Sequence, residues 1–140
     1  MKIKNPVIIA FLSLLGIITF ALVYPFTLKK NSDPAGNKYK TVKVAGKTYQ
    51  LRTATNAAEW SRGLMFVEGK QDYDGMIFYF SDTAPRTFWN MNTYSDLDVI
   101  WMLNDKVIGK SMLPSIKKNN EIVTVSSPGA ANRVIELFKK

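Results

Sequence analysis

The sequence predicts a small, mostly β domain whose antiparallel strands close or nearly close into a barrel, with one short helix and a transmembrane helix before it. Three observations lead to this fold class. About seven short apolar or alternating runs, separated by turn residues, lie between residues 39 and 138, and such runs are typical of β-sandwiches and barrels. A single stretch of this part carries helix-capping residues. An uncharged run of twenty-two residues, 7–28, precedes them all.

The N-terminal segment, residues 1–30, is predicted to be a transmembrane signal-anchor. Its uncharged run is flanked by lysines and is long enough to span a bilayer core of about 30 Å at about 1.5 Å per residue. A cleaved signal peptide is the alternative, but its apolar region is shorter and ends in small residues. We therefore expect this anchor, a linker at 31–38 and a β-rich domain at 39–140.

The expected location is the cell membrane, crossed once, with the β-rich domain on the extracytoplasmic side and facing the cell envelope. A short basic N-terminus directly before an apolar run is the architecture of a signal-anchor. Lys29 and Lys30 also follow the run, and a count of lysines alone favours the opposite orientation.

The first two strands of the domain form a predicted hairpin. Residues 39–44 and 48–53 carry the strand pattern, and Ala45-Gly46-Lys47 between them supplies a tight turn. The antiparallel arrangement of the domain begins with this pair.

A short helix is expected next, followed by a series of strands. Asn56 can cap the helix, Glu59 can return the bond as in a capping box, and Gly63 can end it with a left-handed residue. Residues 76–80 are continuously apolar, which predicts a strand covered on both faces. The same signals predict a loop at 81–85, strands at 97–101, 106–110 and 121–126, a solvated loop at 117–120, and a last strand or short helix at 132–138.

The composition excludes several kinds of chemistry. The chain contains no His and no Cys, so Ser-His-Asp and Cys-His nucleophiles, zinc sites of the usual ligands and haem held by His are impossible. We expect no cofactor and no metal. Four of the nineteen basic residues precede residue 31, so the rest of the chain, with fifteen basic and eleven acidic residues, carries +4 of the formal +8. This excess is spread along the chain, so nucleic acid is not an expected partner.

Residues 88–103 are the most informative stretch. Trp89 closes an aromatic run, and Asn92-Thr93 supplies a turn before an apolar strand. Asp98 lies inside that strand, where a carboxylate needs water, a cation or several hydrogen bonds. We predict that Arg62, the only charge of its own motif, pairs with Asp98. The stretch then marks either a structural ion pair or the rim of a site.

Five motifs occur in an order and spacing that resemble a known family. They are Arg62-Gly63-Leu64-Met65, Gly75-Met76-x-Phe78-x-Phe80, Phe88-Trp89 with Asn92-Thr93, Leu97-Asp98-Val99-Ile100, and Pro128 followed by Val134-x-Glu136-Leu137. The family is known as domain of unknown function 192, and the resemblance extends from Tyr39 to Leu137. It implies a small, mainly β fold in prokaryotic proteins, often behind a signal or anchor, without an established reaction or cofactor.

Two departures from the family pattern bear on the site and the fold. The family reads Phe-Trp-Met-Lys-Asn-Thr, whereas Asn90 and Met91 stand here at its Met and Lys positions, which removes a cation from the turn. The family also continues past the final Glu-Leu with a Gly-containing turn and another strand, whereas Phe138-Lys139-Lys140 follow here. We therefore expect the last part of the barrel to be incomplete or closed differently.

Three functions remain open. The first is a non-catalytic binding or interaction module at the membrane surface, whose ligand site consists of Arg62, Trp89, Asn92, Thr93, Asp98 and Glu136. A Trp ring with amide and hydroxyl groups suits a polar ligand with a flat apolar face, such as a glycan, and an envelope protein is the other expected partner. The second is a hydrolase of an envelope substrate, and the third is a structural accessory subunit of an envelope complex.

The hydrolase would use Asp98 and a second carboxylate, Glu136 or Asp96, as acid and base. We favour binding over catalysis and assign no catalytic residue, since a single acid beside an Arg is more often part of an ion pair than a catalyst.

Overall fold

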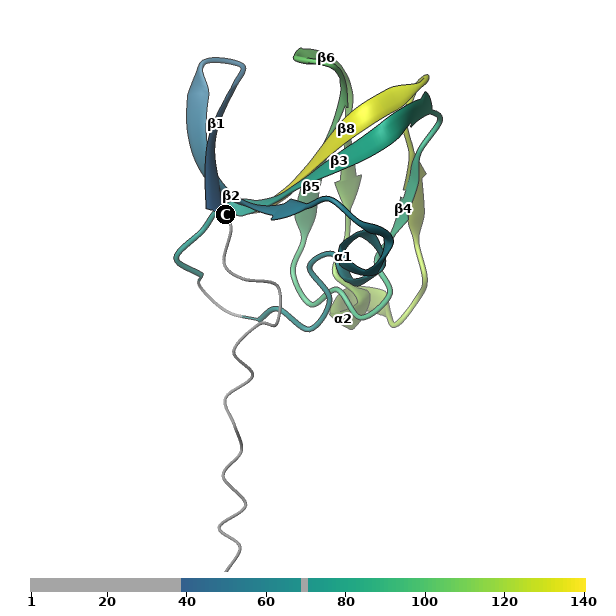
Figure 1. Cartoon of the computed structure of the whole chain (residues 1–140). Coiled ribbons are helices and arrows are strands. Elements are labelled where there is room, and N and C mark those ends of the chain that lie inside the picture. Colours follow the sequence, from purple (N-terminus) through teal and green to yellow (C-terminus); the bar gives the residue numbers. More distant parts are fainter. Residues whose placement is uncertain (1–38, 69–70) are drawn as a thin grey trace, which may run out of the picture. The chain divides into compact units, whose positions relative to one another are not determined.

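The computed structural model describes residues 39–68 and 71–140 (Figure 1). The expected anchor at 1–30 and linker at 31–38 lie outside the described residues. Within the described ranges, no helix is both long and apolar enough to cross a membrane. The described part consists mostly of β-strands.

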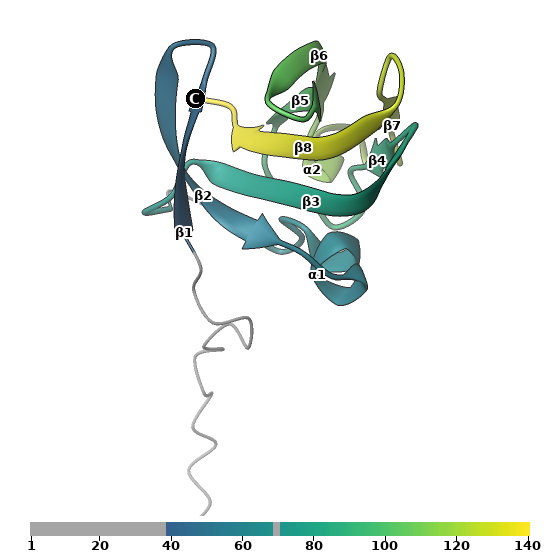
Figure 2. The same cartoon turned by 45° about the horizontal axis from the view of Figure 1, so that its top comes forward.

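Six strands form one sheet, in the order β1-β2-β3-β8-β5-β6. β8 lies between β3 and β5 and joins the two halves of the sheet (Figure 2). The strands of this sheet are β1 (Tyr39–Val44), β2 (Lys47–Ala54), β3 (Gly75–Ala84), β5 (Leu97–Leu103), β6 (Lys106–Leu113) and β8 (Ala131–Phe138). Two shorter strands, β4 (Thr87–Trp89) and β7 (Thr124–Ser126), form a separate antiparallel pair.

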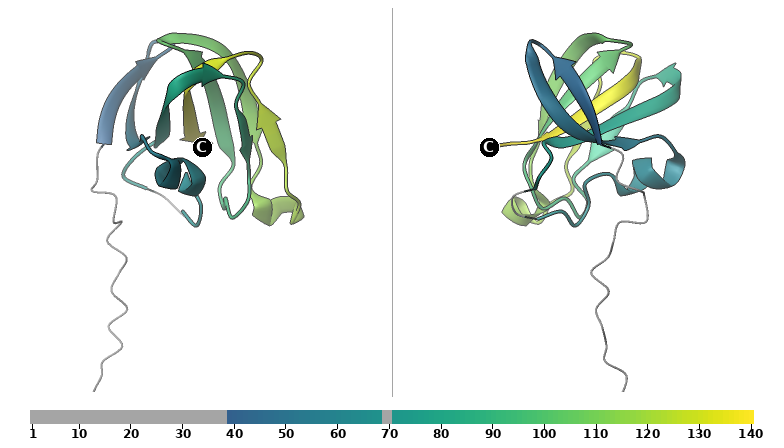
Figure 3. Two further views of the ribbon diagram at one scale, coloured as in Figure 1. Left: turned by 45° about the vertical axis from the view of Figure 1, so that its right-hand side comes forward. Right: turned by 60° about the vertical axis from the view of Figure 1, so that its left-hand side comes forward.

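The mostly β fold class is confirmed, but two of its details differ from the prediction. β2 and β3 run parallel, with Leu51 opposite Gly75. The connection between them contains α1 (Ala57–Arg62), and parallel neighbours need such a crossover. The large sheet curls strongly (Figure 3) but does not close, since among the described strands β1 and β6 are its two ends and do not pair with each other.

Most predicted strands are present, and β3 is longer than expected. The hairpins β1–β2 and β5–β6 pair antiparallel, as their turn residues predict. β3 continues through the expected loop at 81–85 as far as Ala84, because Ala84 pairs with Ala131 of β8 beyond a bulge. Residues 132–138, for which the sequence allows a strand or a short helix, belong to the strand β8.

The predicted helix is α1, and its capping differs slightly from a capping box. The side chain of Asn56 accepts a hydrogen bond from the Glu59 N–H at 3.0 Å. The carboxylate of Glu59 binds chiefly the N–H of Thr55, at 2.6 Å, one residue before the cap. This bond from the Thr55 backbone is the main cause that holds the pKa of Glu59 below its usual range. Gly63 ends the helix with a φ of +47°.

A second helix, α2 (Ile116–Asn119), replaces the solvated loop expected at 117–120. Ser115 caps it by accepting a hydrogen bond from the Lys117 N–H at 3.2 Å, and Asn120 ends it in the left-handed conformation. Four residues are too few for an apolar period to appear in the sequence, which is why the pattern did not predict this helix.

Apolar side chains are buried on both faces of the large sheet. The first cluster consists of Ala54, Leu64, Tyr73, Met76, Phe78, Leu97, Val99, Trp101, Leu113 and Val134. The second cluster, on the other face, consists of Val44, Leu51, Ile77, Ile100, Met102, Ile135 and Leu137. Residues alternate between the clusters along β8, because successive side chains of a strand point to opposite faces. Glu136, two residues after Val134, therefore points toward the first cluster.

Candidate functional site

A small cavity opens beside α1, on the face of the sheet that carries the first cluster. Its volume is about 30 Å³, which is room for about one water-sized group. It is lined by Trp60, Ser61, Arg62, Gly63, Leu64, Met65, Phe78, Phe88, Trp89, Thr93 and Glu136. We call it the Glu136 cavity. Four of the six predicted site residues, Arg62, Trp89, Thr93 and Glu136, thus line one space.

Glu136 provides the buried carboxyl of this cavity. Its exposed fraction is 4%, and it lies opposite Met76 of β3 and Val99 of β5 in the sheet. Within the described ranges, no donor forms a hydrogen bond with its carboxyl group and no cation pairs with it. Burial raises the pKa of Glu136 to about 8, because the ionised form loses its hydration in an apolar environment.

The end of α1 covers this carboxyl group. The N–H of Gly63 donates to the carbonyl of Glu59 at 2.9 Å, which fixes the turn that leaves the helix. A Cβ atom at Gly63 would lie 3.7 Å from Oε2 of Glu136 and 3.4 Å from Cζ of Phe78. The backbone of α1 therefore passes close to the acid, and the same turn brings Arg62 to the cavity wall.

Aromatic rings form much of the wall, and one of them reaches the surface. Phe88 packs edge to face on Phe78, with 4.9 Å between the ring centroids. Trp89, the next residue of β4, is 48% exposed, because alternate residues of a strand point to opposite sides. Trp89 thus lines the cavity with part of the residue and carries a ring that is accessible at the surface.

The turn after β4 contributes one side chain to the cavity. Thr93 is buried and lines it, and its hydroxyl makes a long hydrogen bond of 3.4 Å to the carbonyl of Met91. Asn92 is not among the lining residues. It adopts a φ of +54°, and its carbonyl accepts a hydrogen bond from the Phe66 N–H at 2.8 Å. The predicted turn is present, but Asn92 serves its backbone geometry.

Asp98 lies apart from the other predicted site residues. It is exposed on β5 and faces the side of the second cluster, because its neighbours Leu97 and Val99 belong to the first. It lines a different cavity, of about 600 Å³, together with Lys47, Tyr49, Gln71, Asp72, Tyr73, Asp74, Ser95, Leu137, Phe138, Lys139 and Lys140. The predicted pair of Arg62 and Asp98 is wrong, since no ion pair of the described residues joins them and Asp98 is exposed.

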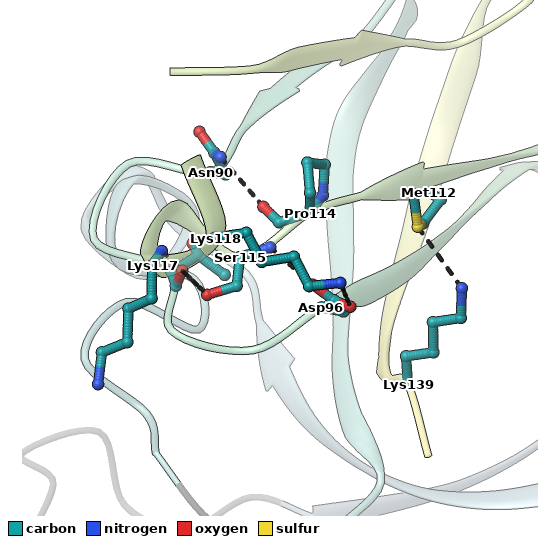
Figure 4. A network of polar contacts seen from close by, with 9 residues as sticks. Asn90, Asp96, Met112, Pro114, Ser115, Lys117, Lys118 and Lys139 are labelled. Carbon is teal, nitrogen blue, oxygen red and sulfur yellow. Dashed lines mark hydrogen bonds and ion pairs between the residues drawn. The ribbon is translucent and has the colours of Figure 1, made fainter. Parts of the chain in front are cut away.

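Asp96, the other acid considered for catalysis, has structural partners (Figure 4). Its side chain accepts a hydrogen bond from the Ser115 N–H at 2.9 Å and forms an ion pair with Lys118. Lys118 first, and then the Ser115 N–H, hold the pKa of Asp96 below its usual range. Asp96 therefore connects the segment before β5 to the start of α2.

Asn90 organises the loops around the site, a role that the sequence analysis did not assign to it. Its buried amide donates to the carbonyls of Pro114 and Glu121 at 3.0 and 3.1 Å and accepts from the Val123 N–H at 2.8 Å. The strand expected at 121–126 is shorter, since β7 begins at Thr124, and the backbone at residues 121 and 123 binds the Asn90 side chain. The departure from the family pattern at this position was the signal in the sequence.

The cavity can accept one small polar group beside an accessible ring. Its polar side chains include a buried carboxyl and a hydroxyl, and aromatic side chains surround them. Among the residues described, no three acidic, His or Cys side chains come together as metal ligands would. A few polar groups in an apolar setting are typical of sites for small polar ligands.

Two solved structures resemble this chain. A candidate transcription regulator from Sinorhizobium meliloti is 25% identical, with a TM-score of 0.56, and the match covers 71% of this chain and 78% of that one. A protein of unknown function from Novosphingobium aromaticivorans is 26% identical, with a TM-score of 0.61, and the match covers 76% and 77%. No curated protein shows significant similarity. The model of the DUF192 family, described as an uncharacterized ACR, matches residues 40–139, and the chain therefore belongs to the DUF192 family.

Proposed function

We propose that this protein is a non-catalytic binding module that holds a polar ligand, such as a glycan, at the Glu136 cavity. The observation that carries the proposal is the buried carboxyl of Glu136, which has no hydrogen-bond partner among the described residues. An unsatisfied buried polar group costs about 1–3 kcal/mol. A ligand group that enters the cavity and forms a hydrogen bond with Glu136 removes this cost. Binding of a ligand therefore explains why an acid lies in an apolar core.

Trp89 supplies the second part of the site. Its exposed ring can stack on the flat apolar face of a sugar while one polar group of the ligand enters beside Thr93. The cavity of about 30 Å³ is far smaller than the roughly 300–1,000 Å³ pockets that enclose whole ligands. The rest of the ligand therefore lies on the surface around Trp89.

The hydrolase has less support than binding. Asp98 and Glu136 line different cavities, and Asp96 is held by Ser115 and Lys118. A carboxylate pair flanking one bond is therefore not available from these acids. The accessory-subunit alternative has no specific observation in its favour.

Retention on insoluble envelope glycans tests the binding proposal. Full-length protein in mild detergent is expected to be retained on peptidoglycan or chitin, and Trp89→Ala is expected to lose retention with little change in stability, because the ring is half exposed. Leu103→Ala is the matched control, since Leu103 is also an exposed apolar residue but does not line the cavity. Equal retention of the two variants, or no retention of the unchanged protein on either glycan, would contradict the proposal.

Trp101→Ala serves as a control for folding in the same experiment. Trp101 is fully buried in the first cluster, and its indole N–H donates to the hydroxyl of Ser111 at 2.9 Å. Its removal is expected to lower the free energy of unfolding by about 3–5 kcal/mol through a core cavity. A loss of retention by Trp89→Ala without such destabilisation therefore reports on binding.

We also propose that residues 7–28 anchor the module in the cell membrane, with the β-rich domain on the extracytoplasmic side, where envelope glycans and proteins are accessible. The support is the uncharged length of this run and the short basic segment before it. The full-length chain should stay in the membrane fraction after alkaline carbonate washing, and protease added to spheroplasts should digest the domain. A mature protein that begins near Ala35 would show that the segment is cleaved instead.

A further inference from the structure

We propose that Glu136 meets its ligand as a neutral carboxylic acid, whose O–H donates to an uncharged hydroxyl oxygen and whose C=O accepts the hydrogen of the same hydroxyl. The cavity then admits a hydroxyl group and rejects ammonium and carboxylate groups of similar size. This inference rests on the proposed function, because it names the ligand group that enters the same cavity.

The environment of the acid is apolar on each strand that packs against it. Met76 of β3 and Val99 of β5 lie directly opposite Glu136 in the sheet, and both are buried in the first cluster. The ring of Phe78 lies on the same face, beside the end of α1. An ionised carboxylate at this position would receive no hydrogen bond from the described residues to compensate its lost hydration.

The charged groups on the neighbouring elements do not neutralise the negative charge that an ionised Glu136 would carry. Within the described ranges, Arg62 is the one other charged side chain that lines the cavity, and the pKa of Glu136 is shifted by burial without a contribution from it. Asp98 lies on the opposite face of the sheet. The other charged groups near these elements have partners of their own: Glu59 binds Thr55, and ion pairs join Asp82 to Arg86, Asp96 to Lys118 and Arg133 to Asp105.

The protonation equilibrium agrees with this geometry. Burial raises the pKa of Glu136 to about 8, so the carboxyl group is mostly protonated at neutral pH. A carboxylic acid that is kept neutral by an apolar site can donate a hydrogen bond, as the oxyanion-binding Asp of ketosteroid isomerase does.

A hydroxyl group matches the cavity in size and in hydrogen bonding. The volume is about 30 Å³, and a neutral carboxyl and a hydroxyl each have one donor and spare acceptor capacity. An ammonium group has donors alone, so it would leave the O–H of Glu136 unsatisfied or force its ionisation. A carboxylate would lose its hydration on entering a cavity surrounded mostly by apolar side chains.

Three single-group probes test this selectivity in the full-length protein in mild detergent at pH 7. Methanol, methylammonium and formate are titrated separately into protein with ¹³C-labelled glutamate carboxyls, and the NMR resonances of Glu136 and the Trp89 indole are followed. Glu136→Gln identifies the Glu136 resonance by its absence. We expect methanol to shift both resonances, and methylammonium and formate to leave both unchanged. We also expect the methanol response to change as the pH rises through about 8, because the ionised carboxylate can accept a hydrogen bond but no longer donate one.

Two variants separate hydrogen bonding from occupancy. Glu136→Gln keeps both a donor group and an acceptor and should retain the methanol response at the Trp89 indole, whereas Glu136→Met should lose it. The inference is overturned if methylammonium moves the NMR resonance of Glu136 to the chemical shift of an ionised carboxylate. It is also overturned if none of the three probes changes that resonance. If methanol enters but glycans are not retained, the proposed function fails while the selectivity stands. If glycans are retained but methylammonium enters, the selectivity fails while the proposed function stands.

Discussion

Asp98 and Glu136 lie on adjacent strands of the large sheet but on opposite faces of it. Glu136 is directly opposite Val99, and Asp98 is directly opposite Leu137, and residues that pair across two strands share a face. One carboxyl group therefore lies in the core and the other in water. Substitutions at the two positions should therefore have independent effects on stability.

The first prediction concerns Arg62 and Asp98. In a double-mutant cycle of Arg62→Met and Asp98→Asn, the coupling energy should lie within about 0.5 kcal/mol of zero, because the side chains line different cavities and distant sites are additive. Urea unfolding of the four proteins gives this value. A coupling of about 3 kcal/mol, as for a buried ion pair, would restore the pairing inferred from sequence.

The second prediction is a pH dependence of stability caused by Glu136. The folded protein keeps the Glu136 proton up to about pH 8, whereas the unfolded chain releases it near its ordinary value of 4.5. The free energy of unfolding should therefore fall as the pH rises through this window, by up to about 1.4 kcal/mol per pH unit. The stabilisation is complete below the lower value and lost above the upper one.

Urea unfolding from pH 5 to pH 9 measures this slope. Glu136→Gln should flatten it, while Glu121→Gln, which changes an exposed acid, should leave it in place. The pKa values of Glu59, Asp82 and Asp96 are lowered, so their contributions change at more acidic pH. Equal slopes in the unchanged protein and Glu136→Gln would show that Glu136 is not protonated in the fold.

The third prediction is that Asn90 is essential for the loops around the site. Asn90→Ala leaves three backbone groups without their partner, and each unsatisfied buried group costs about 1–3 kcal/mol. We therefore expect a total loss of at least about 3 kcal/mol in urea unfolding. Asn132→Ala is the matched control, because Asn132 binds Asn104 in an exposed position and should cost less than about 1 kcal/mol. Similar losses in the two variants would refute the role of Asn90.

The fourth prediction concerns the close approach of β3 and β8. A Cβ atom on Gly75 would lie 1.9 Å from the carbonyl oxygen of Glu136, so the strands must separate to accept Ala. Gly75→Ala should destabilise by about 3 kcal/mol or more, beyond ordinary overpacking. Gly129→Ala, whose Cβ would meet no atom within 4 Å, should change stability by less than about 1 kcal/mol. Thermal unfolding compares the two directly.

The parts of the fold that neighbouring residues decide could be predicted from the sequence. Gly46 in the β1–β2 turn and Asn56 at the start of α1 act within a few residues, and the expected elements form there. The parallel pairing of Leu51 with Gly75 depends on burial of the second cluster, which draws on residues from 44 to 137. No local signal in the sequence encodes such a choice of partner.

In the candidate site, too, some residues could be predicted from the sequence and others could not. Trp89 and Glu136 could be named because they stand in motifs of a known family, and they line one cavity. Asp98 was placed with them because the strand around it is apolar at Leu97, Val99 and Ile100, so the sequence does not reveal which face each residue occupies. The pairing of β5 with β8 fixes which residues of β5 face the Glu136 cavity, and it places Asp98 on the opposite face.

β8 has a consequence for the synthesis of the protein. The half of the sheet made of β1, β2 and β3 meets the half made of β5 and β6 only through residues 131–138, among the described strands. While the chain is being translated, β3 and β5 each present an unpaired edge, and such edges are prone to pair with other chains. The complete large sheet can therefore assemble only after residue 138 has left the ribosomal exit tunnel, and until then β3 and β5 each keep an edge without its β8 partner.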